Sequence, residues 1–188
     1  AAQLLEMWRQ ADYVTVYALP DLAALSVQWD TGADTARAAE LQENTYGGDW
    51  QALLTALFAA DIRKVGHHIK DTMRALLERG VDPKGYIFDT ALAAYLLDAT
   101  AGSYDLQRLF VAYFNEELPK PAQLEQDAFA PLGDTSAAWA AMHSYSSAVA
   151  ALYDILPGRL REMDMTELYE TVELPLCAVL ARMEQRGF

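Results

Sequence analysis

Apolar and polar positions divide the chain into an early part that alternates and a later part with helical spacing. Residues 13–17 and 25–29 are β-branched and aromatic runs, and they predict two strands joined by a Pro-Asp turn. Residues 35–41 are alanine-rich and could form either a helix or a third strand, and we interpret them as strand and loop. Short apolar runs at 63–66 and 86–89 predict two further strands.

Helices are predicted where apolar residues recur every three or four positions. Asp49 and Asp105 are expected to cap two of them, and Gly80 and Pro157-Gly158 to end two others. The order strand-strand-strand-helix-strand-helix-strand-helix-helix predicts an α/β domain with helices packed on a mixed sheet. The predicted apolar faces are Leu53, Leu54, Leu57, Phe58; Met73, Leu76, Leu77; Leu92, Tyr95, Leu96; Leu106, Leu109, Phe110, Tyr113; and Trp139, Met142, Val149, Leu152, Tyr153, Leu156.

The end of the chain predicts a further helix over residues 166–188. Pro175 is expected to kink this helix, because proline lacks a backbone donor and clashes with the preceding turn. Residues 118–133 contain three prolines and predict a long, mobile connection. The side chains expected to face inward from the final helix are Leu168, Val172, Leu176, Val179, Leu180 and Met183.

Composition limits the kinds of protein that this chain can be. Its 188 residues are 53% hydrophobic, which predicts one folded domain with a short appendage. No apolar run approaches the ~20 residues that span a bilayer, and the first residues do not resemble a secretory signal, so we expect a soluble, cytosolic protein. The net charge of -13 argues against broad adhesion to nucleic acid, which needs clustered Lys and Arg.

The histidines and the single cysteine are weak candidates for chemistry. Adjacent His67 and His68 cannot chelate one metal ion together, because neighbouring side chains diverge. We interpret them and His143 as structural or surface residues. Cys177 lies in a helical stripe with no histidine near it in the sequence, so we interpret it as a packing residue.

Carboxylates and a glycine pair are the other candidates. Asp89 follows a predicted strand and Asp71 begins a predicted helix, both suitable places for Mg²⁺ ligands. Asp89-Thr90 is also an ordinary helix cap, which is the interpretation we favour. Gly47-Gly48 is interpreted as a turn that frees the helix start at Asp49, and no phosphate-binding loop motif is present.

Three segments resemble one family. They read Lys64-Val65-Gly66-His67-His68-Ile69-Lys70, then Ile87-Phe88-Asp89-Thr90-Ala91-Leu92, and finally Val172-Glu173-Leu174-Pro175-Leu176. Together they resemble the 3′–5′ exonuclease domain of bacterial DNA polymerase I, a family A polymerase. The resemblance implies a ribonuclease-H-like (DnaQ-like exonuclease) α/β fold. It also implies an exonuclease-like domain over residues 1–160 and, over residues 161–188, a helix that leads into a polymerase domain.

The metal ligands that the resemblance implies are missing from this sequence. The family uses an Asp-x-Glu pair on the first strand, an Asp after the Lys-Val-Gly motif and an Asp on a late helix near a Tyr. Carried over position by position, the Asp residues and the Glu fall on Tyr17, Leu19, Thr72 and Ser146, and the Tyr falls on Met142. No nearby shift restores an acid pair, so the resemblance implies that every metal ligand is lost.

The resemblance therefore implies a catalytically inactive, vestigial exonuclease-like domain that supports a DNA-directed DNA polymerase. The parent protein would be the enzyme, a nucleotidyltransferase, and Mg²⁺ would be needed only by its polymerase domain. This chain would have no metal or other cofactor, would bind the polymerase domain and no membrane, would bind DNA weakly or not at all, and would be a monomer. Two alternatives stay open: an active nuclease with relocated carboxylates (Asp21, Asp71 and Asp89), and an interaction module that binds a protein or a small ligand.

Overall fold

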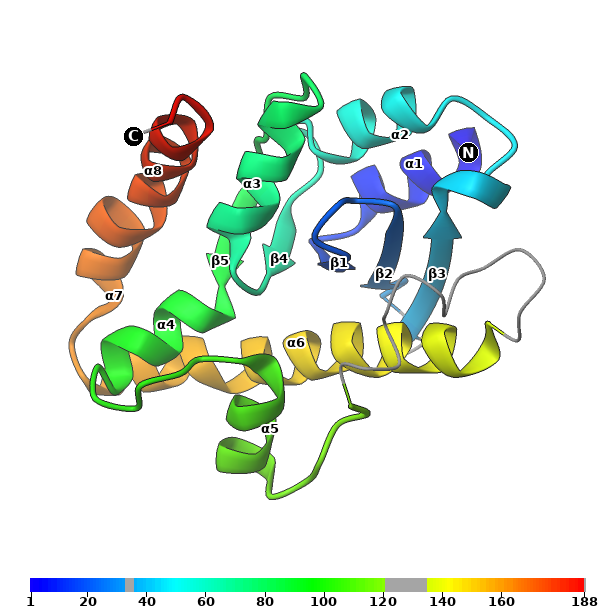
Figure 1. Ribbon diagram of the computed structural model, residues 1–188. Coiled ribbons are helices and arrows are strands. Elements are labelled where there is room, and N and C mark those ends of the chain that lie inside the picture. Colours follow the sequence, from blue (N-terminus) through cyan, green and yellow to red (C-terminus); the bar gives the residue numbers. More distant parts are fainter. Residues whose placement is uncertain (33–35, 121–134, 188) are drawn as a thin grey trace.

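A five-stranded mixed sheet forms the centre of the protein (Figure 1). The computed structural model describes residues 1–32, 36–120 and 135–187. The strands lie in the order β3-β2-β1-β4-β5; β1, β2 and β3 are antiparallel neighbours, whereas β4 and β5 run parallel to β1. Their bounds are β1 Val14–Ala18, β2 Ala24–Asp30, β3 Ala36–Gln42, β4 Lys64–Gly66 and β5 Tyr86–Asp89. The α/β prediction is confirmed, including a strand within the ambiguous alanine-rich segment.

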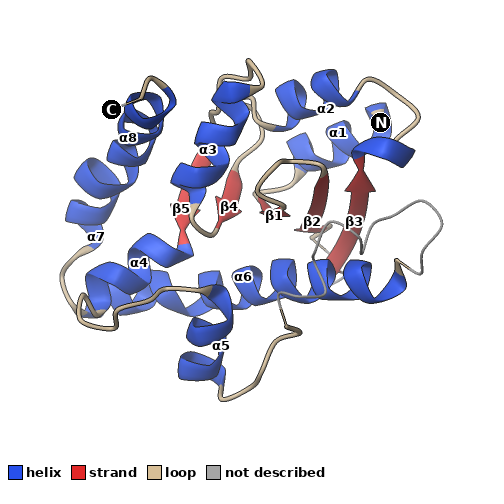
Figure 2. Cartoon of the chain, viewed as in Figure 1, coloured by secondary structure: helices blue, strands red, loops and turns tan. Residues whose placement is uncertain are grey.

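Helices cover both faces of this sheet (Figure 2). One face packs against α1, α2 and α3, and the other against α4, α5 and α6. The bounds are α1 Ala2–Gln10, α2 Trp50–Leu57, α3 Ile69–Glu78, α4 Thr90–Leu97, α5 Leu106–Phe114, α6 Ser136–Glu162, α7 Thr166–Leu168 and α8 Leu174–Gln185, with a 3₁₀ turn η1 at Glu43–Thr45 and a π-helical turn η4 at Tyr169–Glu173.

Alternation along the first two strands separates two hydrophobic clusters. Val14, Val16 and Val27 face α1 and α2, where Trp8 is fully buried. Tyr13, which directly precedes β1, and Tyr17 within β1 face α6, as expected from the period of two in a strand. The sheet therefore has one purely apolar face at β1 and β2 and one mixed face toward α6.

Two of the predicted helix boundaries are confirmed, one by a hydrogen bond and one by a backbone angle. Asp49 accepts from the backbone N–H of Ala52 and so caps α2. Gly80 follows α3 with φ +78°, a conformation that glycine adopts without strain. Asp105 precedes α5 as expected, but its side chain makes no capping hydrogen bond.

One helix and one helix boundary differ from the sequence prediction. Helix α1 was not predicted, although burial of Trp8 anchors its short apolar face. Pro157-Gly158 does not end the long helix: α6 continues to Glu162, because Leu156 and Leu160 remain buried on the same face. Packing of this stripe outweighs the local cost of the proline.

The final helix faces the other way from the prediction. Cys177 and Ala181 are the buried residues of α8 and pack against α3, while Tyr169 is buried at the start of η4. The π-helical turn lies directly before Pro175 and disturbs the helix where a kink was predicted. Small residues let α8 approach α3 closely, so its larger apolar side chains point outward. The expectation was wrong for Leu168, Val172, Leu176, Val179, Leu180 and Met183, which are all between 37% and 52% exposed.

Most of the connection predicted as mobile, residues 118–133, lies outside the described residues. None of the helices within the described ranges is both long and apolar enough to cross a membrane.

Candidate functional site

The end of β1 carries the first two residues that the family alignment singles out. Tyr17 pairs with Ser26 across β1 and β2, so both side chains face α6. The Tyr17 ring lies 5.1 Å from the ring of Tyr145. Burial, together with Tyr145, raises the pKa of Tyr17 to about 12, so its phenol stays neutral at physiological pH. Leu19 packs beside Met142 in a small apolar cluster.

Ser146 occupies the late-helix position and lies in a buried polar network. Its hydroxyl is 2.8 Å from that of Ser26, and the amide of Gln28 donates to Ser146 and to Ser147, each at 2.6 Å. These bonds satisfy polar side chains that would otherwise be costly to bury between a sheet and a helix. The network therefore attaches α6 to β2.

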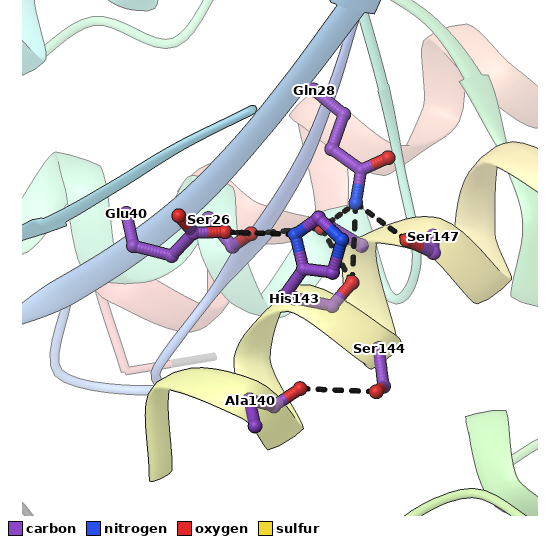
Figure 3. A network of polar contacts seen from close by, with 8 residues as sticks. Ser26, Gln28, Glu40, Ala140, His143, Ser144 and Ser147 are labelled. Carbon is purple, nitrogen blue, oxygen red and sulfur yellow. Dashed lines mark hydrogen bonds and ion pairs between the residues drawn. The ribbon is translucent and has the colours of Figure 1, made fainter. Parts of the chain in front are cut away.

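A contact between His143 and Glu40 completes the network at its rim (Figure 3). Nδ1 of His143 lies 3.0 Å from a carboxylate oxygen of Glu40, and the Ser26 hydroxyl donates to the same oxygen at 3.3 Å. Gln28 and Glu40 are not among the residues that the family motifs single out. The polar alternation of Ser26 and Gln28 within an apolar strand was the available signal for this face.

Thr72 lies on α3, on the other face of the sheet. The nearby side chain of Tyr86 packs with Phe58 in the cluster under α1, α2 and α3. Burial raises the pKa of Tyr86, with the negative charge of Asp89 adding to the rise. Tyr17, Leu19, Met142 and Ser146 thus gather between the sheet and α6, whereas Thr72 lies on α3 at the opposite face of the sheet.

Asp89 holds the starts of two helices. One carboxylate oxygen accepts from the backbone N–H groups of His68 and Ala91, at 2.9 and 3.0 Å, and the other accepts from Ile69 at 3.4 Å. Burial raises the pKa of Asp89, while His68 and these amides oppose the rise. The predicted capping role is confirmed, and it extends from α4 to α3.

The other candidate residues have structural surroundings. The ring of His67 lies between the Thr90 hydroxyl and the backbone carbonyl of Tyr104, both at 2.8 Å, and burial lowers the pKa of His67 to about 3. Cys177 is buried against α3, and burial raises the pKa of its thiol to about 12. The interpretation of His67 as a structural residue and of Cys177 as a packing residue is confirmed.

The residues at the four family positions do not fit Mg²⁺. This ion requires hard oxygen ligands, usually carboxylates, in near-octahedral geometry. Tyr17 offers a neutral phenol, Leu19 an alkyl group and Thr72 a neutral hydroxyl, and the Ser146 hydroxyl already has hydrogen-bond partners. Across residues 1–32, 36–120 and 135–187, no three His, Cys, Asp or Glu side chains gather closely enough to hold a metal ion.

Among the described residues, the three relocated carboxylates do not gather into one metal site. Asp21 accepts from the backbone N–H of Ala23 in the turn before β2. Asp71 is exposed at the first turn of α3 and borders a cavity of about 280 Å³ together with Asp89. Both oxygens of Asp89 accept from amides, so its carboxylate serves the fold.

Comparisons with known proteins place this geometry in a family. A family model described as 3′-5′ exonuclease matches residues 14–157. DNA polymerase I of Mycobacterium tuberculosis is 33% identical over 170 residues, which are 89% of this chain and 18% of that protein. The chain thus spans about a fifth of the length of this relative.

Solved structures agree with this result. The POL domain of Pol1 from M. smegmatis, in complex with DNA primer-template and dNTP, has a TM-score of 0.76 and 27% identity; the match covers 99% of this chain and 30% of that one. NrnC of Brucella melitensis bound to pGG has a TM-score of 0.69 and 20% identity, over 97% of this chain and 89% of that one. At that identity, the second likeness establishes the shared fold alone.

Proposed function

The chain belongs to the 3′-5′ exonuclease family of bacterial DNA polymerase I, and from this premise we propose that it has lost hydrolysis and supports a polymerase domain. The observation that carries the proposal is the replacement of the family's first carboxylate pair by Tyr17 and Leu19, which pack against Tyr145 and Met142. Hydrolysis of a phosphodiester by this family depends on metal ions that activate water and stabilise charge. A buried phenol and an alkyl side chain supply neither function.

The supporting role is proposed for residues 161–188. Tyr169 joins this segment to the sheet, because its hydroxyl contacts both the backbone N–H and the carbonyl of Asp89, at 2.6 and 3.0 Å. The relatives are much longer than this chain, which leaves room for a polymerase domain beyond the matched region. In the proposed arrangement, the segment is fixed to the sheet and holds the polymerase domain in place relative to it.

Weak DNA binding and a bacterial cytoplasmic location belong to the same proposal. With a net charge of -13, the chain repels phosphates over most of its surface, so the parent's affinity for DNA would reside in the polymerase domain. The relatives, which are bacterial DNA polymerases, support the proposed location.

The decisive experiment is a nuclease assay on the 188-residue chain. Single-stranded DNA labelled at its 3′ end is incubated with the chain and Mg²⁺ or Mn²⁺, beside an active 3′-5′ exonuclease as the positive control. We expect no shortening of the label by the chain. Shortening from the 3′ end that EDTA abolishes would overturn the proposal.

An Asp89→Asn variant separates residual activity from contamination. If relocated carboxylates supported hydrolysis, this variant would lose the activity while a Glu78→Gln variant, changed at an exposed residue of α3, would keep it. Activity that survives in both variants would point to a contaminating nuclease.

A further inference from the structure

A cavity of about 300 Å³ lies beside the end of α1 and the end of β2. Its wall includes Met7, Ala11 and Asp12 from α1 and the turn that follows it, together with Trp29 and Asp30 from β2. We infer that this cavity binds a neutral purine nucleoside of the guanine type, whose base presents adjacent N–H donors beside an acceptor oxygen. The inference does not rest on the proposed loss of hydrolysis, because it concerns a different part of the fold.

The cavity lies away from the positions that the family alignment singles out. Trp29 pairs with Val14 at the start of β1, whereas Tyr17 pairs with Ser26 three residues further along the strand. Since successive strand residues rise by about 3.3 Å, roughly 10 Å separates the two places along the sheet. The described wall of the cavity contains none of the four family positions. A ligand in the cavity would therefore use a set of contacts of its own.

Two carboxylates border the cavity without a basic partner. Asp12 and Asp30 come from different segments of the chain, and both are exposed to solvent. Across residues 1–32, 36–120 and 135–187, no ion pair joins either of them to a lysine, arginine or histidine. The described part of the wall contains no basic side chain. Because ionised carboxylates only accept hydrogen bonds, a ligand must bring the donors.

An indole N–H on the same wall supplies the opposite function. Trp29 is 6% exposed, and its Nε1 is buried with no hydrogen-bond partner among the described residues. The ring packs edge-on against that of Trp8, with 5.9 Å between the centroids, which holds it in place. A buried donor without an acceptor is costly, so its place beside a cavity favours an acceptor that arrives with a ligand.

The two functions together match one edge of guanine. The N1–H and the 2-amino group of this base are adjacent donors, and its O6 is the neighbouring acceptor. One carboxylate can accept from both donors at once, as it does from the paired N–H groups of an arginine. The acceptor oxygen then suits the indole N–H of Trp29. Hypoxanthine lacks the 2-amino donor, and adenine lacks both donors of this edge.

The size of the cavity favours a base over a metal ion. A water molecule takes up about 30 Å³ in the liquid, so the cavity holds roughly ten non-hydrogen atoms, the size of a purine. Met7 and Ala11 add an apolar surface on which a planar ring can pack. A metal ion would need further ligands, and no three His, Cys, Asp or Glu side chains of the described residues gather to hold one.

Negative charge at the cavity favours a nucleoside over a nucleotide. Burial raises the pKa of Tyr13 on the cavity wall, and the nearby carboxylates of Asp154, Asp30 and Asp12 add to the rise. The whole chain carries -13, which adds to this negative potential. A phosphate group would be repelled, whereas a neutral base and sugar would not.

Calorimetric titration with nucleosides tests the site. The 188-residue chain is titrated with guanosine, inosine and adenosine at low salt in the presence of EDTA. We expect one-to-one binding of guanosine with a Kd below about 1 mM, and at least about tenfold weaker binding of the other two, because each lost donor leaves an acceptor unpaired. Guanosine 5′-monophosphate should bind more weakly than guanosine, and added salt should reduce that difference.

Two double variants test the carboxylates. Asp12→Asn/Asp30→Asn replaces the acceptors by amides and should weaken guanosine binding at least about tenfold. Glu78→Gln/Asp105→Asn is the matched control, because it removes the same charge from two exposed residues outside the described wall. The affinity of this control for guanosine should equal that of the unaltered chain.

A third variant tests the indole donor. Trp29→Phe removes the N–H and keeps an aromatic ring at the wall, so guanosine should bind it at least about threefold more weakly. Because a smaller ring in the core can lower stability, thermal unfolding accompanies each titration. If Trp29→Phe does not fold, the two double variants at exposed positions decide the test.

Four outcomes would overturn the inference. They are no binding of guanosine at about 1 mM, equal affinity for guanosine and adenosine, equal affinity of the two double variants, or displacement of guanosine by spermidine, which would identify a site for organic cations. Nuclease activity in the earlier assay would overturn the proposed loss of hydrolysis and leave this inference unchanged.

Discussion

Two buried charged residues are used to hold backbone groups in place. Asp89 accepts hydrogen bonds from three backbone amides at the starts of α3 and α4. Lys64 is fully buried, and its ammonium donates to the carbonyls of Leu57, Ala59 and Ile62 at 2.5 to 3.0 Å. Three donors meet three acceptors, so this charge is satisfied without a carboxylate. Both residues belong to the motifs that carry the family resemblance, yet their contacts are structural.

Replacing Asp89 tests the capping role directly. Asp89→Asn leaves one carbonyl oxygen and turns an NH₂ group toward backbone donors, so we expect the free energy of unfolding to fall by about 2–4 kcal/mol. Urea denaturation measures this loss. Asp71→Asn changes an exposed carboxylate in the first turn of α3, one of the two helices that Asp89 caps. It should change the free energy of unfolding by no more than about 0.5 kcal/mol. Equal effects of the two substitutions would contradict a special role for Asp89.

Lys64 predicts a pH dependence of stability. Burial lowers the pKa of Lys64 from 10.5 to about 7 in the folded chain. Between these values the unfolded chain binds the proton that the folded chain has released, so stability should rise with pH relative to a Lys64→Met variant. Urea denaturation of both proteins from pH 7 to pH 10 measures the difference. A constant difference would show that the three carbonyls keep the ammonium charged throughout.

At the scale of elements, the sequence predicted the type and order of helices and strands better than it predicted which face of each packs inward. Alternation located β1 and β2, and the weaker alanine-rich segment proved to be β3. The stripe of α6 was correct for Met142, Val149 and Leu152, which are fully buried. The stripe of α8 was assigned the wrong side, because periodicity identifies an apolar face but not what covers it. Contact with α3 uses small residues and ion pairs, which leave no hydrophobic signal in the sequence.

The continuation of α6 through Pro157 yields an element-scale prediction. Proline inside a helix removes one hydrogen bond and clashes with the preceding turn, and burial of Leu156 and Leu160 offsets this cost here. Pro157→Ala should therefore raise the free energy of unfolding by about 1–3 kcal/mol. Differential scanning calorimetry measures the gain. A lower melting temperature would mean that the proline shapes a bend on which the packing depends.

At the scale of the whole molecule, the family framework survives around a rebuilt site. The sequence located Tyr17, Leu19 and Ser146, and the structure gathers them between the sheet and α6. It could not predict that Gln28 donates to the hydroxyl of Ser146, since this contact joins segments far apart in the chain. In the proposed function, contacts of this kind satisfy polar groups around the positions that metal ligands occupy in the family, which lets the same fold persist without hydrolysis.

This view predicts that Mg²⁺ does not stabilise the protein. A site with a Kd of about 0.1 mM would add about 2.7 kcal/mol at about 10 mM Mg²⁺, because ligand that binds only the folded state shifts the equilibrium. For a chain of this size that stabilisation corresponds to roughly 5–10 °C in Tm. We expect a change within about 1 °C, measured by thermal unfolding with Mg²⁺ and with EDTA. A Tyr17→Asp/Leu19→Glu/Ser146→Asp variant is the matched comparison: its clustered carboxylates repel one another, so its Tm should fall in EDTA and recover in part with Mg²⁺. A rise of several degrees in the unaltered chain would reveal a metal site that the four family positions do not provide.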